Sequence, residues 1–154
     1  MVAPVEIGLA RPGEASWIAL YSRDLIEHGL GWGWTPSRIL RAMATKDTNV
    51  AVARQGDRPV GFGIMRYCDE EAHLLLLGVA ANRLRKGIGS ALMAWLERTA
   101  LDAGIGVIRL EARKRNESAR AFYRSLGYRE VTFASAMYAR DEDGVRIFKD
   151  LWAG

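Results

Sequence analysis

The sequence has few residues that could bind a metal or form a covalent cross-link. Its 154 residues include one cysteine, Cys68, and two histidines, His28 and His73. A single cysteine cannot form an internal disulfide, and a cysteine-based metal cluster needs several thiolates. No HExxH spacing occurs, so we expect no metal site. A chain without disulfides is typical of a reducing compartment, and we predict a cytoplasmic location.

Long apolar runs are also missing. The longest run free of polar side chains covers residues 74–81, whereas a helix needs about 20 apolar residues to cross a bilayer. The first residues, MVAPVEIGLARP, lack the basic-then-apolar layout of a signal peptide. We therefore expect neither a membrane span nor a leader.

Basic residues outnumber acidic residues by a small margin. The 22 Lys and Arg and 18 Asp and Glu leave a net charge of +4, which suits an anionic ligand but is also common on solvated surfaces. Two basic groups precede expected helices: Arg83, Arg85 and Lys86, then Arg113, Lys114 and Arg115. Neither group is interleaved with aromatic residues, so we expect no nucleic-acid partner.

The hydrophobic pattern predicts an α+β fold, in which a mixed central β-sheet carries helices on both faces. A composition that is 49% hydrophobic and 26% charged is typical of one globular domain, expected over residues 1–154. The expected helices cover residues 12–28, 36–44, 87–103 and 117–126, and the expected strands cover residues 5–9, 49–54, 59–67, 73–80, 107–112, 129–138 and 145–151.

A glycine pair marks the start of the third expected helix. Gly87 and Gly89 follow Arg85 and Lys86 directly. The first N–H groups of a helix are unpaired and lie at the positive end of its dipole, and glycines let a phosphate approach the backbone. This turn suits an anion, although an ordinary helix start after a basic loop has the same pattern.

Two nucleotide-binding motifs fit this turn poorly. A P-loop has Lys-Ser/Thr after its last glycine, but Ser90 and an alanine follow here. A dinucleotide fold needs a third glycine where Leu92 stands, and it turns directly from strand to glycine, whereas seven residues intervene here.

A second pattern covers residues 116–128, Asn-Glu-Ser-Ala-Arg-Ala-Phe-Tyr-Arg-Ser-Leu-Gly-Tyr. Asn116 suits a helix N-cap, and the apolar residues that include Phe122 and Tyr123 recur at helical spacing. Taken by itself, this segment is typical of a helix packed on a core.

Together, the two segments resemble the GNAT superfamily of N-acetyltransferases. The family's Gln/Arg-x-x-Gly-x-Gly/Ala segment is similar to residues 79–92, and its N-x-x-A-x-x-F-Y-x-x-L-G-F/Y block is similar to residues 116–128. Leu84 and Ala81 depart from the family's usual Gln or Arg and proline. With the flanking strands, the resemblance covers about residues 50–151.

The resemblance implies a GNAT-like sheet of about seven strands and acetyl-CoA as co-substrate. It implies that main-chain groups bind the diphosphate and that strand N–H groups stabilise the oxyanion where the central strand parts from its neighbour. The implied residues are Arg85, Lys86, Gly87, Ile88, Gly89 and Ser90 for the diphosphate, Leu77, Gly78 and Val79 for the oxyanion, and Asn116 and Tyr123 for the CoA arm and sulfur. Gly78 also suggests a β-bulge.

Tyr123 is the expected general acid. When an amine attacks a thioester, the sulfur leaves as a thiolate. A phenol with a reference pKa of ~10 is protonated at neutral pH and can donate to that thiolate.

Glu111 is the first candidate for the base that deprotonates the acceptor, and His73 is the second. The run from Glu111 to Asn116 and Tyr123 is similar to that of ribosomal-protein alanine N-acetyltransferases, which implies that Glu111 acts through water. Glu111 also fits an ordinary exposed strand carboxylate, and His73 fits a polar residue at a strand end.

The acceptor is expected to be a small-molecule primary amine, with a protein N-terminus or lysine as the alternative. An aromatic wall can hold a cation and exclude water. The candidates for this wall and its carboxylate are Trp17, Tyr21, Asp24, His28, Trp32, Trp34, Tyr138 and Phe148. The same residues fit a core or a homodimer contact, and a non-catalytic acyl-CoA-binding module is the rival function.

Overall fold

A seven-stranded sheet organises the residues described by the structure, a computed structural model that covers residues 4–23, 33–80, 87–133 and 144–153. The strand order is β1-β2-β3-β4-β5-β7-β6. The strands are β1 (Val5–Leu9), β2 (Thr48–Gln55), β3 (Arg58–Tyr67), β4 (Glu71–Val79), β5 (Val107–Arg113), β6 (Arg129–Phe133) and β7 (Gly144–Asp150). All seven predicted strands are confirmed, although the part of β6 expected beyond residue 133 lies outside the described residues.

The helices begin where the sequence has capping residues. Thr35 accepts a hydrogen bond from the Arg38 N–H at 3.3 Å, and Asn116 accepts one from the Ala119 N–H at 3.1 Å, so both expected N-caps are confirmed. The helices are α1 (Ala15–Tyr21), α2 (Pro36–Ala44), α3 (Ile88–Asp102) and α4 (Glu117–Ser125), and a 3-10 turn (Pro12–Glu14) precedes α1. The end of the helix predicted over residues 12–28 lies outside the described residues.

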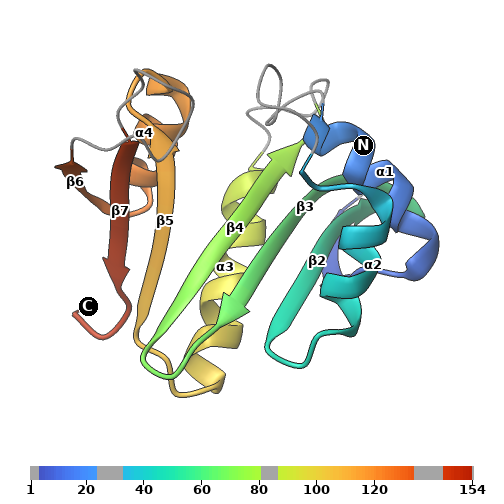
Figure 1. Ribbon diagram of the computed structural model, residues 1–154, viewed down its shortest axis with the longest axis horizontal. Helices are drawn as coiled ribbons and strands as arrows, with labels where there is room; N and C mark the ends of the chain where they lie inside the picture. The colour runs from blue at the N-terminus through green and yellow to red at the C-terminus, as the bar shows by residue number, and fades with distance from the viewer. Residues whose placement is uncertain (1–3, 24–32, 81–86, 134–143, 154) are drawn as a thin grey trace.

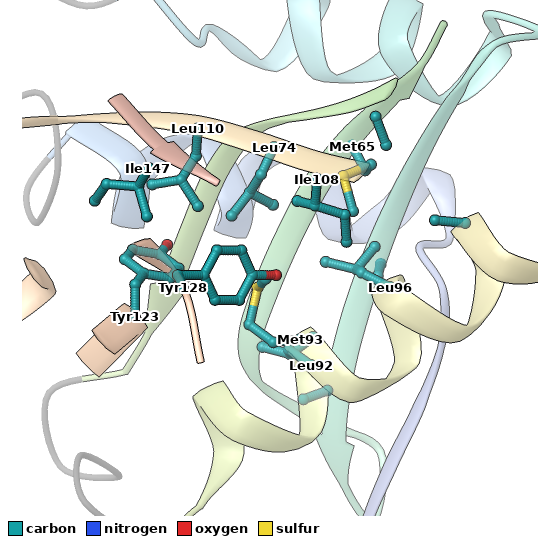
Figure 2. Close-up of a cluster of buried hydrophobic side chains, with 14 of the residues drawn as sticks. Met65, Leu74, Leu92, Met93, Leu96, Ile108, Leu110, Tyr123, Tyr128 and Ile147 are labelled. Carbon is teal, nitrogen blue, oxygen red and sulfur yellow. The ribbon is translucent and has the colours of Figure 1, made fainter. Parts of the chain in front are cut away.

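The helices cover opposite faces of the sheet (Figure 1). One apolar cluster joins α3 and Tyr123 of α4 to one face, and Figure 2 shows Leu92 and Leu96 of α3 within it, together with Ile108 of β5. The other cluster packs α1 and α2 against β2 and β3. The predicted α+β fold with helices on both faces is confirmed. Among the described helices, none is long and apolar enough to cross a membrane.

A β-bulge reorients the second half of β4. Leu74 packs in the α3 cluster, whereas Leu76, two residues later, packs in the α1 and α2 cluster. Side chains two apart on a regular strand share a face, so one extra residue must intervene. The β3–β4 register shifts here, with Met65 opposite Leu74 and Ile64 opposite Leu76. The expectation of a bulge at the glycine two positions after Leu76 is wrong, because β4 is back in regular pairing by that point.

The strands β4 and β5 part soon after they begin to pair. Their parallel ladder covers residues 71–73 and 107–109, yet β4 continues to Val79 and β5 to Arg113. Figure 1 shows the two strands diverging from the common end of the sheet. Backbone groups on the facing edges of the diverging segments therefore have no partners in a β4–β5 ladder. The predicted parting of the central strand from its neighbour is confirmed.

Candidate active site

The start of α3 presents backbone donors at the end of the sheet where β4 terminates. Gly87 is the N-cap, with a φ of 79° that disfavours residues with a side chain, and no side chain of the described residues caps the helix with a hydrogen bond. The first helical bond from this cap runs from the Ala91 N–H to the Gly87 carbonyl, at 3.0 Å. The N–H groups of residues 88–90 precede that bond and suit an anion. Arg85 and Lys86 lie outside the described residues.

Gly89 brings α3 and α4 together. A Cβ on Gly89 would lie 3.1 Å from the Phe122 ring and 3.8 Å from a methyl of Val79. The missing side chain therefore leaves room for Phe122, which is a packing role in addition to the predicted phosphate role. This contact places the first turn of α3 beside the helix that carries Tyr123.

Tyr123 lies in the apolar cluster on the α3 face. Its ring is 5.0 Å from that of Phe122 and 5.6 Å from that of Tyr128, both in tilted, edge-on arrangements. Figure 2 shows Tyr123 and Tyr128 near Met93 and Ile147. Burial raises the pKa of the Tyr123 hydroxyl above its usual value, so the phenol is protonated at neutral pH.

The two buried tyrosines differ in their hydroxyl contacts. The Tyr128 hydroxyl donates to Oε2 of Glu97 at 2.9 Å, and Lys149 binds the other oxygen of that carboxylate at 3.0 Å. No hydrogen bond to the Tyr123 hydroxyl is found within the described residues. Tyr123 is therefore the phenol with a hydroxyl left to donate to a ligand.

The end of β4 directs alternate N–H groups toward the divergence. The Ala80 N–H donates to Val60 on β3 at 2.9 Å. Because N–H groups two residues apart point to the same edge of a strand, the Gly78 N–H also lies on the β3 side. The N–H groups of Leu77 and Val79 then point toward the side of β5, whereas that of Gly78, also expected to bind the oxyanion, does not.

Four polar side chains gather on the face opposite α3, where β4 and β5 part. We call Glu71, His73, Arg109 and Glu111 the junction cluster. His73 Nε2 lies 2.7 Å from Oε1 of Glu111, and Nη1 of Arg109 donates to Oε2 of Glu111 at 2.7 Å. Arg109 also donates to Glu71 through Nε at 3.2 Å, and its Nη2 lies 3.3 Å from Nδ1 of His73.

The cluster holds Glu111 as a carboxylate. Burial would raise the pKa of Glu111, but the hydrogen bond from His73, together with the charge and hydrogen bond of Arg109, outweighs burial and lowers it. The side chains of His73 and Glu111 are each 14% exposed, so water can reach them. The two base candidates of the sequence are thus one hydrogen-bonded pair.

Glu111 and Tyr123 lie on opposite faces of the sheet. Leu110 packs in the same cluster as Tyr123, and its strand neighbour Glu111 points to the other face. A thioester lying between the diverging strands would have the phenol on one side and the carboxylate on the other. Among the described residues, no group of three potential ligands could hold a metal ion.

The described aromatic candidates lie on the face of the sheet opposite α3 but differ in role. Trp17 is half-buried, 4.5 Å from the ring of Tyr21 and 5.8 Å from that of Phe62. Trp34 is buried, with the guanidinium of Arg38 3.9 Å from its ring, so it is a core residue. Phe148 is half-buried on β7. The remaining candidates, Asp24, His28, Trp32 and Tyr138, lie outside the described residues.

Sequence reasoning missed the part that Arg109 plays. Arg109 and Glu111 alternate with buried residues, which predicts that they share a face. The contact with His73 depends on the parallel register that pairs His73 with Arg109, and no local pattern encodes that register.

Comparison with known proteins agrees with the fold and the two motifs. The model of the acetyltransferase (GNAT) family matches residues 15–128. The chain therefore belongs to the acetyltransferase (GNAT) family, and the resemblance seen in the sequence is confirmed.

Similar proteins carry several acetyltransferase names. The chain is 32% identical over 105 residues to the [ribosomal protein bS18]-alanine N-acetyltransferase of Escherichia coli (strain K12), covering 68% of this chain and 70% of that protein. It is 28% identical over 119 residues to the mycothiol acetyltransferase of Corynebacterium efficiens, which covers 75% of this chain but only 40% of that longer protein. An aminoglycoside 6'-N-acetyltransferase complexed with coenzyme A shares the fold, with a TM-score of 0.80, 18% identity and coverage of 95% of this chain and 97% of that one.

Proposed function

We propose that the protein transfers an acetyl group from acetyl-CoA to a primary amine by direct attack of the amine on the thioester. The observation that carries this proposal is the contact of Phe122 with Gly89 beside the divergence of β4 and β5. It joins a helix start suited to an anion to a buried tyrosine, next to the point where β4 and β5 stop pairing with each other. A similar fold in complex with coenzyme A supports this choice of co-substrate.

The first turn of α3 would bind the diphosphate of the co-substrate. Main-chain N–H groups of residues 88–90 would donate to its oxygens. Arg85 and Lys86 would add positive charge, as the sequence predicts. The Oδ1 of Asn116 caps α4, which leaves its amide N–H₂ group to donate to the CoA arm.

The chemistry needs two protons to leave the acceptor nitrogen. One proton of the ammonium passes through water to Glu111 and then to solvent, and the neutral amine attacks the thioester carbonyl carbon. The N–H groups of Leu77 and Val79 would stabilise the oxyanion. As the carbon–sulfur bond breaks, Tyr123 gives its proton to the thiolate to form the free thiol of CoA, and the second proton lost from nitrogen restores the Tyr123 phenol.

A protein or peptide α-amine is our first choice of acceptor. A relative that is 32% identical over 68% of this chain and 70% of its own length is named for alanine N-acetylation of a ribosomal protein. A small-molecule amine, the acceptor expected from the sequence, becomes the second candidate, because the half-buried Trp17 and Tyr21 form an aromatic pair suited to a cationic ligand. We also propose that the protein is cytoplasmic, as expected from the sequence.

Two measurements test this function. Titration calorimetry with coenzyme A should show saturable binding, and a free-thiol assay with acetyl-CoA should show turnover with peptides that begin with alanine. The same thiol assay is run with a panel of small primary amines. Turnover with these amines but not with the peptides would make a small-molecule amine the acceptor. Binding without turnover with either kind of acceptor would favour an acyl-CoA-binding module, and absence of binding would refute the proposal.

A further inference from the structure

Arg109 determines the hydrogen-bonding roles in the junction cluster. An arginine side chain carries only donors, so the Nδ1 atom of His73, 3.3 Å from Nη2 of Arg109, must be the acceptor. The ring proton of a neutral His73 is then on Nε2. From there it is donated to Oε1 of Glu111, 2.7 Å away.

The same arginine completes the contacts of Glu111. Its Nη1 donates to Oε2, so each oxygen of the carboxylate accepts one hydrogen bond from the cluster. Each carboxylate oxygen can accept a second bond, which leaves room for water. A proton on Nδ1 of His73 would face the guanidinium N–H of Arg109, and that arrangement is unfavourable for both charge and hydrogen bonding.

Besides Arg109 on β5, the charged neighbours of the His73–Glu111 pair come from three strands. On β3, Arg66 is opposite His73, and on β7, Arg146 is opposite Glu111; both arginine side chains are exposed. On β4, Glu71 lies 3.2 Å from the guanidinium of the cluster and is more exposed than Glu111. Exposed charges are screened by solvent, so the partly buried contact of Arg109 has the larger effect on the pair.

We infer that Arg109 is a positioning residue for proton removal from the acceptor amine. It holds His73 as the neutral Nε2–H tautomer and Glu111 as an oriented carboxylate, with a lone pair directed to the water that receives the proton. The inference rests on the proposed acetyl transfer. It assigns the proton removed from the amine to Glu111, and it excludes His73 as the first group to take up that proton.

A purely structural role is the competing explanation. Arg109 pairs directly with His73 at the last residues of the β4–β5 ladder, so it also helps to join the two strands. Loss of that role would lower stability, and activity would then fall equally at every pH. A positioning role instead changes the tautomer of His73 and the shape of the pH profile.

Nitrogen-15 NMR of the histidine rings tests the tautomer without any activity measurement. The chain has two histidines, and a His28→Gln variant assigns the remaining signal to His73. Near pH 7 we expect a protonated Nε2 and an unprotonated Nδ1. A charged imidazolium or the opposite tautomer in the wild type would overturn the inference, even if no acceptor amine is ever found.

The pH dependence of kcat/KM tests the function of the arrangement. In Arg109→Leu, the acidic limb should move to higher pH by about one unit, because an opposite charge next to Glu111 is lost. Arg109→Lys, which keeps the charge, should keep the limb near its wild-type position. Arg98→Leu is the matched control, because it removes an exposed ion pair with Asp102 on α3.

The possible outcomes separate the two hypotheses. A shifted limb in Arg109→Leu, together with a mixed His73 tautomer, supports positioning. An unshifted limb with an unchanged tautomer leaves only the structural role and refutes the inference. If Arg109→Leu does not fold, the wild-type tautomer still decides, because a charged imidazolium or the opposite tautomer overturns the inference. A wild type that fails to acetylate any amine refutes the proposed function, while the NMR result stands separately.

Discussion

The two faces of the sheet beside the β4–β5 divergence differ in chemistry. On the α3 face, Tyr123 lies among apolar side chains, and within the described residues its hydroxyl has no hydrogen-bond partner. On the opposite face, Glu111 lies in a cluster where both carboxylate oxygens accept hydrogen bonds. One face therefore keeps a phenol protonated, and the other keeps a carboxylate ionised. A reaction that must both donate and remove protons at neutral pH needs this difference.

The largest expected effect comes from removing the phenol on the α3 face. Tyr123→Phe should lower kcat by about 10³-fold, because the departing thiolate loses its donor. The fold should persist, since the ring remains in the core. Thiol release at saturating acetyl-CoA measures the change.

Tyr128→Phe is the matched control for that prediction. It removes the hydrogen bond to Glu97 and should cost about 1.5–3 kcal/mol of unfolding free energy, as for a bond to a charged group. Its kcat should stay within a few-fold of wild type. Equal losses of activity in both tyrosine variants would argue against a distinct role for Tyr123.

The carboxylate on the opposite face should have the next largest effect. Glu111→Gln should lower kcat/KM by about 10²-fold at neutral pH, because an amide cannot take the proton. Glu71→Gln changes a more exposed carboxylate of the same cluster and should have little effect. The two variants are compared at several pH values with the same acceptor, and similar losses would mean that Glu111 has no special part in proton removal.

A smaller effect is expected where the two motifs touch. Gly89→Val would push Phe122 away, because even a Cβ would lie 3.1 Å from its ring. Overpacking costs about 1–3 kcal/mol, and we expect about 10-fold weaker binding of coenzyme A by calorimetry. Gly13→Val is the control, since nothing lies within 4 Å of a Cβ there. Unchanged affinity in Gly89→Val would mean that the contact does not shape the site.

The smallest effect concerns stability in acid. The pKa of Glu111 is lowered in the folded protein, so ionisation of Glu111 stabilises the fold above its unfolded pKa of about 4.3. That contribution is lost as the pH falls through the lower folded pKa. The unfolding free energy should therefore decrease below about pH 4.3, and the decrease should be smaller in Glu111→Gln. Denaturant titrations at pH 6 and pH 3.5 measure it, and equal decreases in both proteins would contradict the pairing.

Much of the fold was predictable because its signals are local. Thr35 and Asn116 cap helices as expected, and strand β1 has the predicted bounds. The β-bulge was predicted at Gly78, because glycine is the local sign of such irregularities. In the structure the extra residue of the bulge is Leu75. Nothing in the run of leucines around it indicates that Leu74 and Leu76 face opposite sides of the sheet. The position of the bulge follows from the opposite faces on which Leu74 and Leu76 are buried.

The candidate site was only partly predictable. The two motifs correctly indicated that the start of α3 and Tyr123 belong together, but Phe122 and Gly89 as the joining pair required the packed structure. The sequence offers Glu111 and His73 as competing base candidates, whereas the structure pairs them. No local pattern in the sequence points to Arg109 as a site residue.

The sequence by itself determined the family, the order of the elements and the residues of the two motifs, because caps, periodicity and glycine turns act over a few neighbouring residues. Tertiary structure alone decided which face each side chain occupies beside the divergence and which partners Glu111 has. Those outcomes depend on one bulge in β4 and on three residue pairs between β4 and β5, which join segments more than thirty residues apart in the chain.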